Sequence, residues 1–259
     1  EQNDLQISNL PRDEMSPVDA ARPPHAPSYP NVQAMVFIGT AIGFLIGISM
    51  AFFLESLDTA ISTLAEVERL TGHPVLAIIP PIHIAREDAK AAATRYGIDE
   101  ARPLPVISDP RSPSAEAYRT LRTVLEYSFF SQGKRTLLIT SATPAEGKTT
   151  TLANLALASA SAGRRTLVIG ANLRHPVLSR IFASDESMPG LSDLLAGEAD
   201  LADAIQETAF PDLHLLDAGN RLSRPAELLS TPFLPQVLAA LSHAYDAVLI
   251  DSPPVLPVA

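Results

Sequence analysis

A loop that ends in Gly147-Lys148-Thr149-Thr150 carries the residues best suited to chemistry. A short apolar run precedes this loop and an Ala/Leu-rich helical pattern follows it, so we expect a strand, a phosphate-binding loop and a helix in that order. In such a P-loop, successive backbone N–H groups and a helix N-terminus surround an anion. Lys148 is expected to reach the β- and γ-phosphates, and the Thr149 hydroxyl to ligate Mg²⁺. The predicted cofactors are therefore ATP and Mg²⁺.

The whole loop is predicted to hold the nucleotide, although its motif is relaxed. Ala142 stands at the first position of G-x-x-x-x-G-K-[ST], where a glycine is usual. Lys148 is also predicted to be catalytic, through its contact with the β- and γ-phosphates. The predicted nucleotide-binding residues are Ala142, Thr143, Pro144, Ala145, Glu146, Gly147, Lys148, Thr149 and Thr150.

A second apolar run closes in an acidic residue at Asp251. Ligands of open parallel sheets bind at the carboxyl ends of the strands, and Lys148 and Asp251 both fall at such ends. Asp251 is therefore predicted to be catalytic and to hold Mg²⁺ together with Thr149. The alternative is an acidic residue that merely follows a strand.

Strand and helix patterns alternate around these residues. This alternation predicts an α/β fold of the P-loop NTPase type, with a mostly parallel sheet flanked by helices on both faces and an end just after the Asp251 strand. The predicted strands are 137–140, 166–169, 213–216 and 247–250. The predicted helices are 149–162, 176–182, 190–195, 202–207, 225–229 and 232–244.

One apolar segment, Ala34–Leu54, carries no charged residue. At 1.5 Å per residue it gives a helix of about 31 Å, which is enough to cross a membrane. The alternative, a buried core helix, would normally show a polar face. Small residues recur along it at every fourth position and predict a face for close helix–helix packing in lipid. These are Gly39, Gly43, Gly47 and Ala51.

Proline content and the span suggest four regions. Residues 1–33 are predicted to be an extended extracytoplasmic segment and 34–54 a transmembrane helix. Residues 55–113 are predicted to be a juxtamembrane segment and linker with a helix near 87–96, and 114–259 an incomplete P-loop domain. Because ATP is cytoplasmic, we expect the C-terminal side of the span to face the cytoplasm.

Composition excludes two classes of site. The chain of 259 residues has no cysteine, which excludes disulfides and thiolate metal sites. Its net charge of −10 argues against a nucleic-acid partner, because general nucleic-acid binders show a basic face.

Three charged residues, Glu116, Arg119 and Arg122, share one side of a predicted helix that begins at Ser114. Within one chain, Glu116 and Arg119 would form a surface ion pair worth a few tenths of a kcal/mol. Across a subunit boundary, the same charges could set the geometry of a partner.

As a set, these motifs resemble those of the bacterial tyrosine kinases of the polysaccharide co-polymerase family. The resemblance implies a membrane-anchored, ATP-dependent protein-tyrosine autokinase that regulates polymerisation and export of capsular polysaccharide or exopolysaccharide. It places the chain in the bacterial inner membrane with a cytoplasmic kinase domain, and it joins those domains into a homo-oligomeric ring through the Glu116/Arg119/Arg122 helix. It also implies the polysaccharide export machinery and a tyrosine phosphatase as partners. The segments that carry it are 57–80, 116–122, 141–150, 190–197, 225–230 and 250–255.

Two departures from that family affect the expected activity. Gly170 and Asn172 stand where the family has two aspartates that help hold Mg²⁺ and prepare the tyrosine hydroxyl. Asparagine keeps the shape of aspartate without its charge, and glycine keeps neither, so phosphoryl transfer is expected to be impaired. The chain is also expected to be an internal piece that lacks the family's periplasmic domain and C-terminal tyrosine cluster.

Two alternatives remain open. The chain could be a non-catalytic nucleotide-binding scaffold of a polysaccharide co-polymerase. It could also be a partitioning-type P-loop ATPase, but those enzymes carry a lysine early in the loop, where Thr143 stands here.

Overall fold

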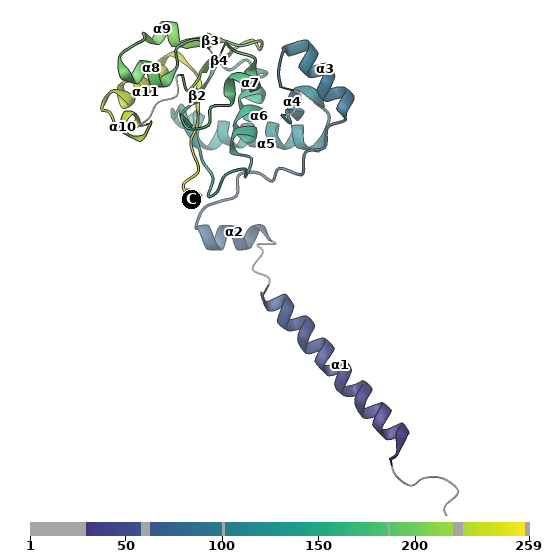
Figure 1. The fold of residues 1–259 in the computed structure, drawn as a ribbon. Coiled ribbons are helices and arrows are strands. Elements are labelled where there is room, and N and C mark those ends of the chain that lie inside the picture. Colours follow the sequence, from purple (N-terminus) through teal and green to yellow (C-terminus); the bar gives the residue numbers. More distant parts are fainter. Residues whose placement is uncertain (1–29, 58–62, 100–101, 186, 220–224, 257–259) are drawn as a thin grey trace, which may run out of the picture. The chain divides into compact units, whose positions relative to one another are not determined.

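The computed structural model describes residues 30–57, 63–99, 102–185, 187–219 and 225–256 (Figure 1). Two compact units are present, one ending at Glu66 and the other beginning at Val67. Most of the segment 1–33, which is predicted to be extended, lies outside the described residues.

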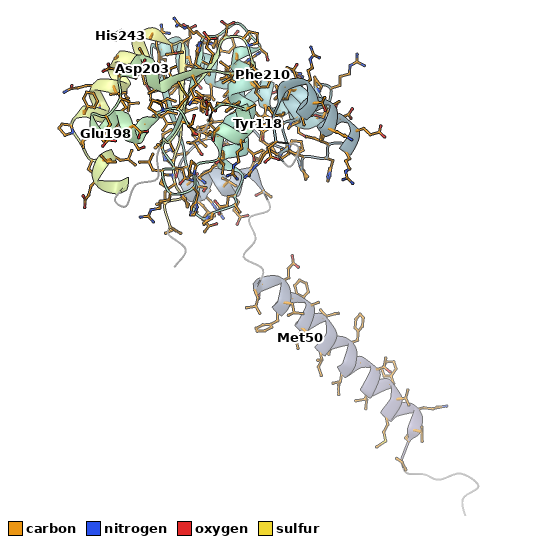
Figure 2. The ribbon with its side chains drawn as sticks, turned by 45° about the horizontal axis from the view of Figure 1, so that its top comes forward. Met50, Tyr118, Glu198, Asp203, Phe210 and His243 are labelled. Carbon is orange, nitrogen blue, oxygen red and sulfur yellow. The ribbon has the colours of Figure 1, made fainter. Side chains whose placement is uncertain are left out.

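The first unit contains helix α1 (Val32–Leu57), which is somewhat longer than the predicted span of 34–54. Among the described residues, α1 is the one helix long and apolar enough to cross a membrane, with a mean hydropathy of 2.2. Its large apolar side chains project outward on all sides, as Met50 does in Figure 2, and none of its residues is buried. The apolar surface of α1 is therefore not covered by the described residues of its own unit.

The second unit is built on a five-stranded sheet in the order β1-β5-β2-β4-β3. Strands β1, β5, β2 and β4 pair in parallel, and β3 pairs antiparallel with β4 at the edge. The prediction of a mostly parallel sheet is therefore confirmed. The strands are β1 (Thr136–Ile139), β2 (Thr166–Gly170), β3 (Ile205–Glu207), β4 (Leu213–Leu216) and β5 (Ala247–Asp251).

Helices cover both faces of this sheet (Figure 1). One face, which we call the α6 face, packs against α5 (Pro113–Ser128), α6 (Lys148–Ala160) and α7 (Leu178–Phe182). The short 3₁₀ helix η2 (Phe130–Gln132) follows α5 and adds Phe130 to the same core. The other face, the α11 face, packs against α8 (Leu191–Ala196), α10 (Pro225–Leu229) and α11 (Phe233–Ala244).

Helix α6 begins at Lys148, and its apolar residues pack in the core of the domain. Tyr118 of α5 is 1% exposed and packs into the same core as α6 (Figure 2). Burial raises the pKa of Tyr118, and its hydrogen bond with Thr151 opposes that shift. The apolar residues of α6 from Leu152 to Ala160 are all buried, because α5 and the sheet enclose the helix.

The segment between α1 and α5 contains one short helix more than the sequence predicts. Helices α2 (Leu64–Thr71) and α3 (Arg86–Tyr96) lie there, and α3 agrees with the helix predicted at 87–96. A further short helix, α4 (Pro105–Ser108), was not predicted. The amide of Asn154 on α6 holds this stretch by accepting from Val106 N–H at 3.4 Å and donating to the carbonyl of Pro103 at 3.1 Å.

The helix predicted at 202–207 is wrong in its second half. Helix α9 (Leu201–Ala204) ends after one turn, and residues 205–207 form β3 instead. Pairing of Ile205 with Leu216 and of Glu207 with His214 outweighs the local helical pattern. Segment 75–79 forms neither a helix nor a strand.

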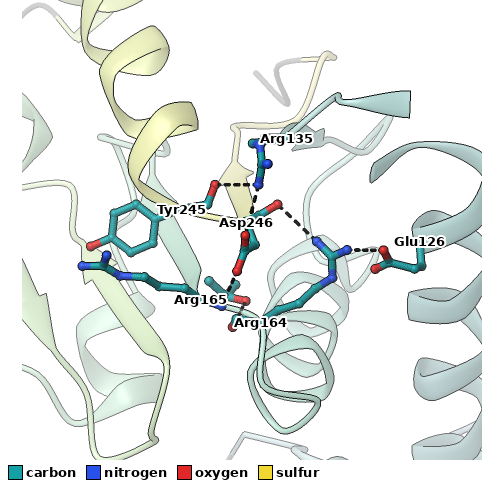
Figure 3. A network of polar contacts seen from close by, with 7 residues as sticks. Glu126, Arg135, Arg164, Arg165, Tyr245 and Asp246 are labelled. Carbon is teal, nitrogen blue, oxygen red and sulfur yellow. Dashed lines mark hydrogen bonds and ion pairs between the residues drawn. The ribbon is translucent and has the colours of Figure 1, made fainter. Parts of the chain in front are cut away.

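A polar network ties together the amino ends of three strands (Figure 3). The Asp246 carboxylate accepts from Arg135 Nη1 at 3.1 Å and from Arg165 N–H at 3.1 Å. Arg164 donates to the Asp246 carbonyl at 3.3 Å and also pairs with Glu126 of α5. These contacts join the starts of β1, β2 and β5 to α5.

Replacing Asp246 with alanine is expected to lower the free energy of unfolding by about 1 kcal/mol, since it removes one half-exposed ion pair and one backbone hydrogen bond. Urea unfolding of the full chain measures this effect. Nucleotide affinity should not change, because the network lies at the opposite end of the sheet from the P-loop. Asp203→Ala, an exposed change on α9, is the control; an equal loss of stability in both variants would contradict the prediction.

Candidate nucleotide-binding site

The P-loop runs from the carboxyl end of β1 to the first turn of α6. Gly147 caps the helix with φ +84°, and Ala145 also lies at positive φ, so the backbone turns sharply before Lys148. Thr151 N–H bonds to Gly147 O at 2.8 Å and starts the helical pattern. The preceding N–H groups of the first turn have no intrahelical partner and are available to an anion.

Glu146 folds back on the loop that carries it. Its carboxylate accepts from the Thr143 hydroxyl at 2.6 Å and from Ala142 N–H at 3.0 Å. These hydrogen bonds, the one from Thr143 foremost, lower the pKa of Glu146. The carboxylate is therefore ionised near neutral pH and holds the first half of the loop against the second.

Thr149 and Asp251 meet at the base of the loop. The Thr149 hydroxyl donates to the Asp251 carboxylate, with oxygens 2.9 and 3.2 Å away. Asp251 ends β5 and is 1% exposed, while Thr149 lies in the first turn of α6. The structure thus brings together the two residues that the sequence singled out from positions more than 100 residues apart.

The surroundings of Asp251 fit a divalent cation. Burial raises the pKa of Asp251, while the hydrogen bond from Thr149 and the charge of Lys148 lower it in part. A buried carboxylate beside a hydroxyl is the kind of oxygen pair that a hard cation such as Mg²⁺ takes as a direct ligand and a water-mediated ligand. Such a cation would add to the positive charge that Lys148 already provides near this carboxylate.

A cavity of about 500 Å³ opens at the P-loop, and Thr149 is one of the residues that line it. Loop residues 144, 145 and 147–150 form one wall, and Pro253 and Pro254 line it beyond β5. Three basic residues that were not predicted as site residues, Arg102, Arg174 and His175, also line it. Arg174 and His175 come shortly after a predicted strand, where ligands of parallel sheets bind, so their position in the sequence could have identified them as site residues. Arg102 lies in the predicted linker, and no feature of the sequence indicated that it reaches the cavity.

The two positions of the degenerate acidic motif, Gly170 and Asn172, lie at and just after the end of β2. Gly170 ends β2 and pairs with Asp251 across the sheet. Asn172 lines the cavity and is 8% exposed, and its Oδ1 has no hydrogen-bond partner within the part of the chain that the structure describes. A polar oxygen in this state fits a site that gains a ligand.

The charged helix face predicted for oligomerisation makes contacts within the chain. Arg119 pairs with Glu116 at 2.9 Å and also donates to the carbonyl of Pro110 at 2.7 Å. Arg122 donates to the carbonyl of Ala158 on α6 at 3.2 Å. The side chain of Glu116 is 68% exposed, so its role between subunits stays a prediction.

A parallel sheet with a phosphate-binding loop after β1, a helix N-terminus behind it and an acidic residue at the end of β5 defines a P-loop NTPase fold. The AAA domain family model matches residues 134–259, which hold all of these parts.

Comparison with known proteins shows which P-loop proteins this chain is similar to. The chain is 32% identical over 242 residues to the putative tyrosine-protein kinase EpsB of Ralstonia solanacearum, covering 93% of this chain and 32% of EpsB. It is 37% identical over 153 residues to the tyrosine-protein kinase YwqD of Bacillus subtilis, covering 59% of this chain and 64% of YwqD. The chain therefore spans about a third of the length of EpsB.

Solved structures agree with these relatives. The BceF tyrosine kinase domain matches with a TM-score of 0.66 and 34% identity, covering 77% of this chain and 79% of that domain. The kinase domain of the Escherichia coli tyrosine kinase ETK matches with a TM-score of 0.66 and 30% identity, covering 77% of this chain and 75% of that domain. The chain belongs to the bacterial tyrosine-kinase family.

Proposed function

We propose that this chain is part of a membrane-anchored, ATP-dependent protein-tyrosine autokinase that regulates polymerisation and export of capsular polysaccharide or exopolysaccharide. The observation that carries the proposal is the contact between Thr149, next to Lys148 at the start of α6, and the buried Asp251 at the end of β5. Named relatives that are tyrosine-protein kinases support the choice of phosphoryl transfer over other P-loop chemistry.

In this proposal the chain's own residues position ATP. Backbone N–H groups of residues 142–150 surround the phosphates, and the Lys148 ammonium neutralises charge at the β- and γ-phosphates. Thr149 and Asp251 are the residues that would hold Mg²⁺, and the ion would supply positive charge against the phosphate oxygens. Arg174 and His175 line the cavity beside Asn172, and the Arg174 guanidinium adds positive charge there.

Phosphoryl transfer is proposed to be slow in this form. Neither Gly170 nor Asn172 carries a carboxylate, so neither can accept the proton of an incoming tyrosine hydroxyl. The same observation favours the second candidate, a non-catalytic scaffold that binds nucleotide to set assembly of the co-polymerase.

Localisation and assembly are also proposals. Helix α1, of 26 residues, is about 39 Å long and would place the chain in the bacterial inner membrane, with the P-loop domain in the cytoplasm. We propose a homo-oligomeric ring formed through the Glu116/Arg119/Arg122 helix, assisted by the small-residue face of α1. The polysaccharide export machinery and a tyrosine phosphatase are the proposed partners.

Two measurements test the proposal. Isothermal titration of the chain with Mg-ATP should show binding, and ³²P transfer to tyrosine in the full-length protein should be slow but measurable. Asn172→Asp should increase the rate by about 100-fold, since it places a proton-accepting carboxylate in the cavity. Binding without any transfer, in the native form and in Asn172→Asp, would assign the chain to the scaffold class. Absence of ATP binding would overturn both candidates.

A further inference from the structure

Asp217 is a buried carboxylate that the nucleotide site described above does not use. It directly follows β4 and is 7% exposed. Its Oδ1 atom has no hydrogen-bond partner among the described residues. A carboxylate oxygen in this state is costly unless a ligand, a cation or water satisfies it.

The register of the sheet places Asp217 in line with Asp251. Along β4, Leu213 and Leu215 pack on the α6 face and Leu216 on the α11 face, so alternation puts Asp217 on the α6 face. The same alternation puts Gly170 and Asp251 on the α6 face, where Asp251 meets Thr149. Gly170 pairs with Asp251, and Ile169 pairs with Leu216, the residue before Asp217. Two carboxylates therefore flank a glycine on three neighbouring strands, beside the P-loop helix.

The missing side chain of Gly170 leaves the space that Asp217 uses. A Cβ atom on Gly170 would lie 3.1 Å from Asp217 Oδ1 and 2.9 Å from the backbone N of Ala218. The carboxylate of Asp217 therefore leans from β4 over β2, in the direction of β5. Strands two positions apart lie about 9.5 Å apart, which leaves room between two inward-leaning carboxylates for a cation with its water.

We propose that Asp217 supplies the second carboxylate of the Mg²⁺ site, acting through water across Gly170 and opposite Asp251. This inference rests on the proposed nucleotide-binding function. Position 170 has no carboxylate in this chain, and in this proposal Asp217, which follows the neighbouring strand β4, provides one instead. Asn172 adds a further polar side chain to the site. Mg²⁺ prefers oxygen ligands and keeps several waters, so a water-mediated carboxylate suits it.

Mn²⁺ affinity tests the proposal without any measure of catalysis. The full chain in detergent is saturated with ADP and titrated with Mn²⁺, and free Mn²⁺ is followed by electron paramagnetic resonance. Asp217→Asn should weaken Mn²⁺ binding about tenfold, as is typical for loss of an outer-sphere partner, and leave metal-free ADP affinity unchanged. Asp212→Asn, an exposed change at the other end of β4, should have no effect.

The outcomes separate the two proposals. Native chain that binds ADP, with Mn²⁺ affinity unaltered in Asp217→Asn, would overturn the role of Asp217 and leave the nucleotide site intact. Native chain that binds no nucleotide would overturn the proposed function and this inference with it.

A steric test needs no ligand. Gly170→Asp should lower the melting temperature by about 5 °C, since the new Cβ meets the Asp217 carboxylate and the backbone next to it. In an Asp217→Ala background, the same change should cost less, because the carboxylate is gone; in an Asp212→Ala background, it should cost as much as in the native chain. Equal costs in all three backgrounds would show that Asp217 does not occupy this space and would overturn the inference.

Discussion

Lys148→Ala is expected to weaken ATP binding by about 100-fold while leaving the melting temperature within experimental error. A charge-assisted hydrogen bond to phosphate contributes about 1.5–3 kcal/mol, and each 1.4 kcal/mol is a factor of ten in affinity. Lys148 stands at the first position of α6 and lines the cavity, so the loss falls on binding. The core of α6 begins at Leu152, which explains why stability should be spared.

Titration calorimetry with Mg-ATP measures this effect, and Lys134→Ala is the matched control. Lys134 lies before β1 and contacts the ring of Phe129, so its removal changes net charge by the same amount away from the cavity. Lys148→Arg should retain part of the affinity, because it keeps the charge but not the compact ammonium group. If Lys148→Ala and Lys134→Ala bind ATP equally well, the P-loop does not grip the nucleotide as proposed.

Asp251→Asn is expected to remove most of the Mg²⁺ dependence of ATP binding and to slow phosphoryl transfer by about 100-fold or more. The amide keeps an oxygen near Thr149 but loses the charge that would hold the cation. The Thr149 hydroxyl, which donates to Asp251 in the native chain, can donate to this amide oxygen instead.

The same substitution should stabilise the metal-free protein at neutral pH. Burial raises the pKa of Asp251 above its unfolded value, so the fold favours the protonated carboxyl. The stabilisation of the protonated form is fully present below the unfolded pKa, about 3.9, and is lost as the pH rises through the higher folded pKa. Asparagine avoids that loss because it never ionises.

Melting temperatures between pH 4 and pH 8, with and without Mg-ADP, test both halves of this prediction. Without metal, Asp251→Asn should melt above the native chain at pH 8, and the difference should shrink toward pH 4. With Mg-ADP, the order should reverse. Asp212→Asn serves as the exposed control; a native chain that is the more stable of the two at pH 8 without metal would contradict the argument.

The parts of the fold that the sequence predicted are those with strong local patterns. The apolar runs of β2, β4 and β5 begin and end within one residue of their predicted bounds, since buried parallel strands are continuously apolar. The P-loop helix α6 was predicted because it also has a strong local pattern, a glycine cap followed by a long Ala/Leu run.

The missed parts depend on distant contacts. Helix α4 forms where Leu104 and Val106 pack into the core and Asn154 accepts a hydrogen bond from Val106 N–H. No local periodicity in the sequence predicts this helix. Strand β3 exists because β4 offers an edge, whereas the local residues favour a helix. Arg102 reaches the cavity for the same reason, since its segment packs on the domain from outside the predicted boundary at Ser114.

The contact of Glu146 with its own loop has a consequence for how nucleotide enters. The Glu146 carboxylate occupies two hydrogen-bond donors of the loop, the Thr143 hydroxyl and Ala142 N–H. A phosphate group that used these two donors would have to displace the carboxylate. Binding at this part of the loop would therefore exchange one anion for another.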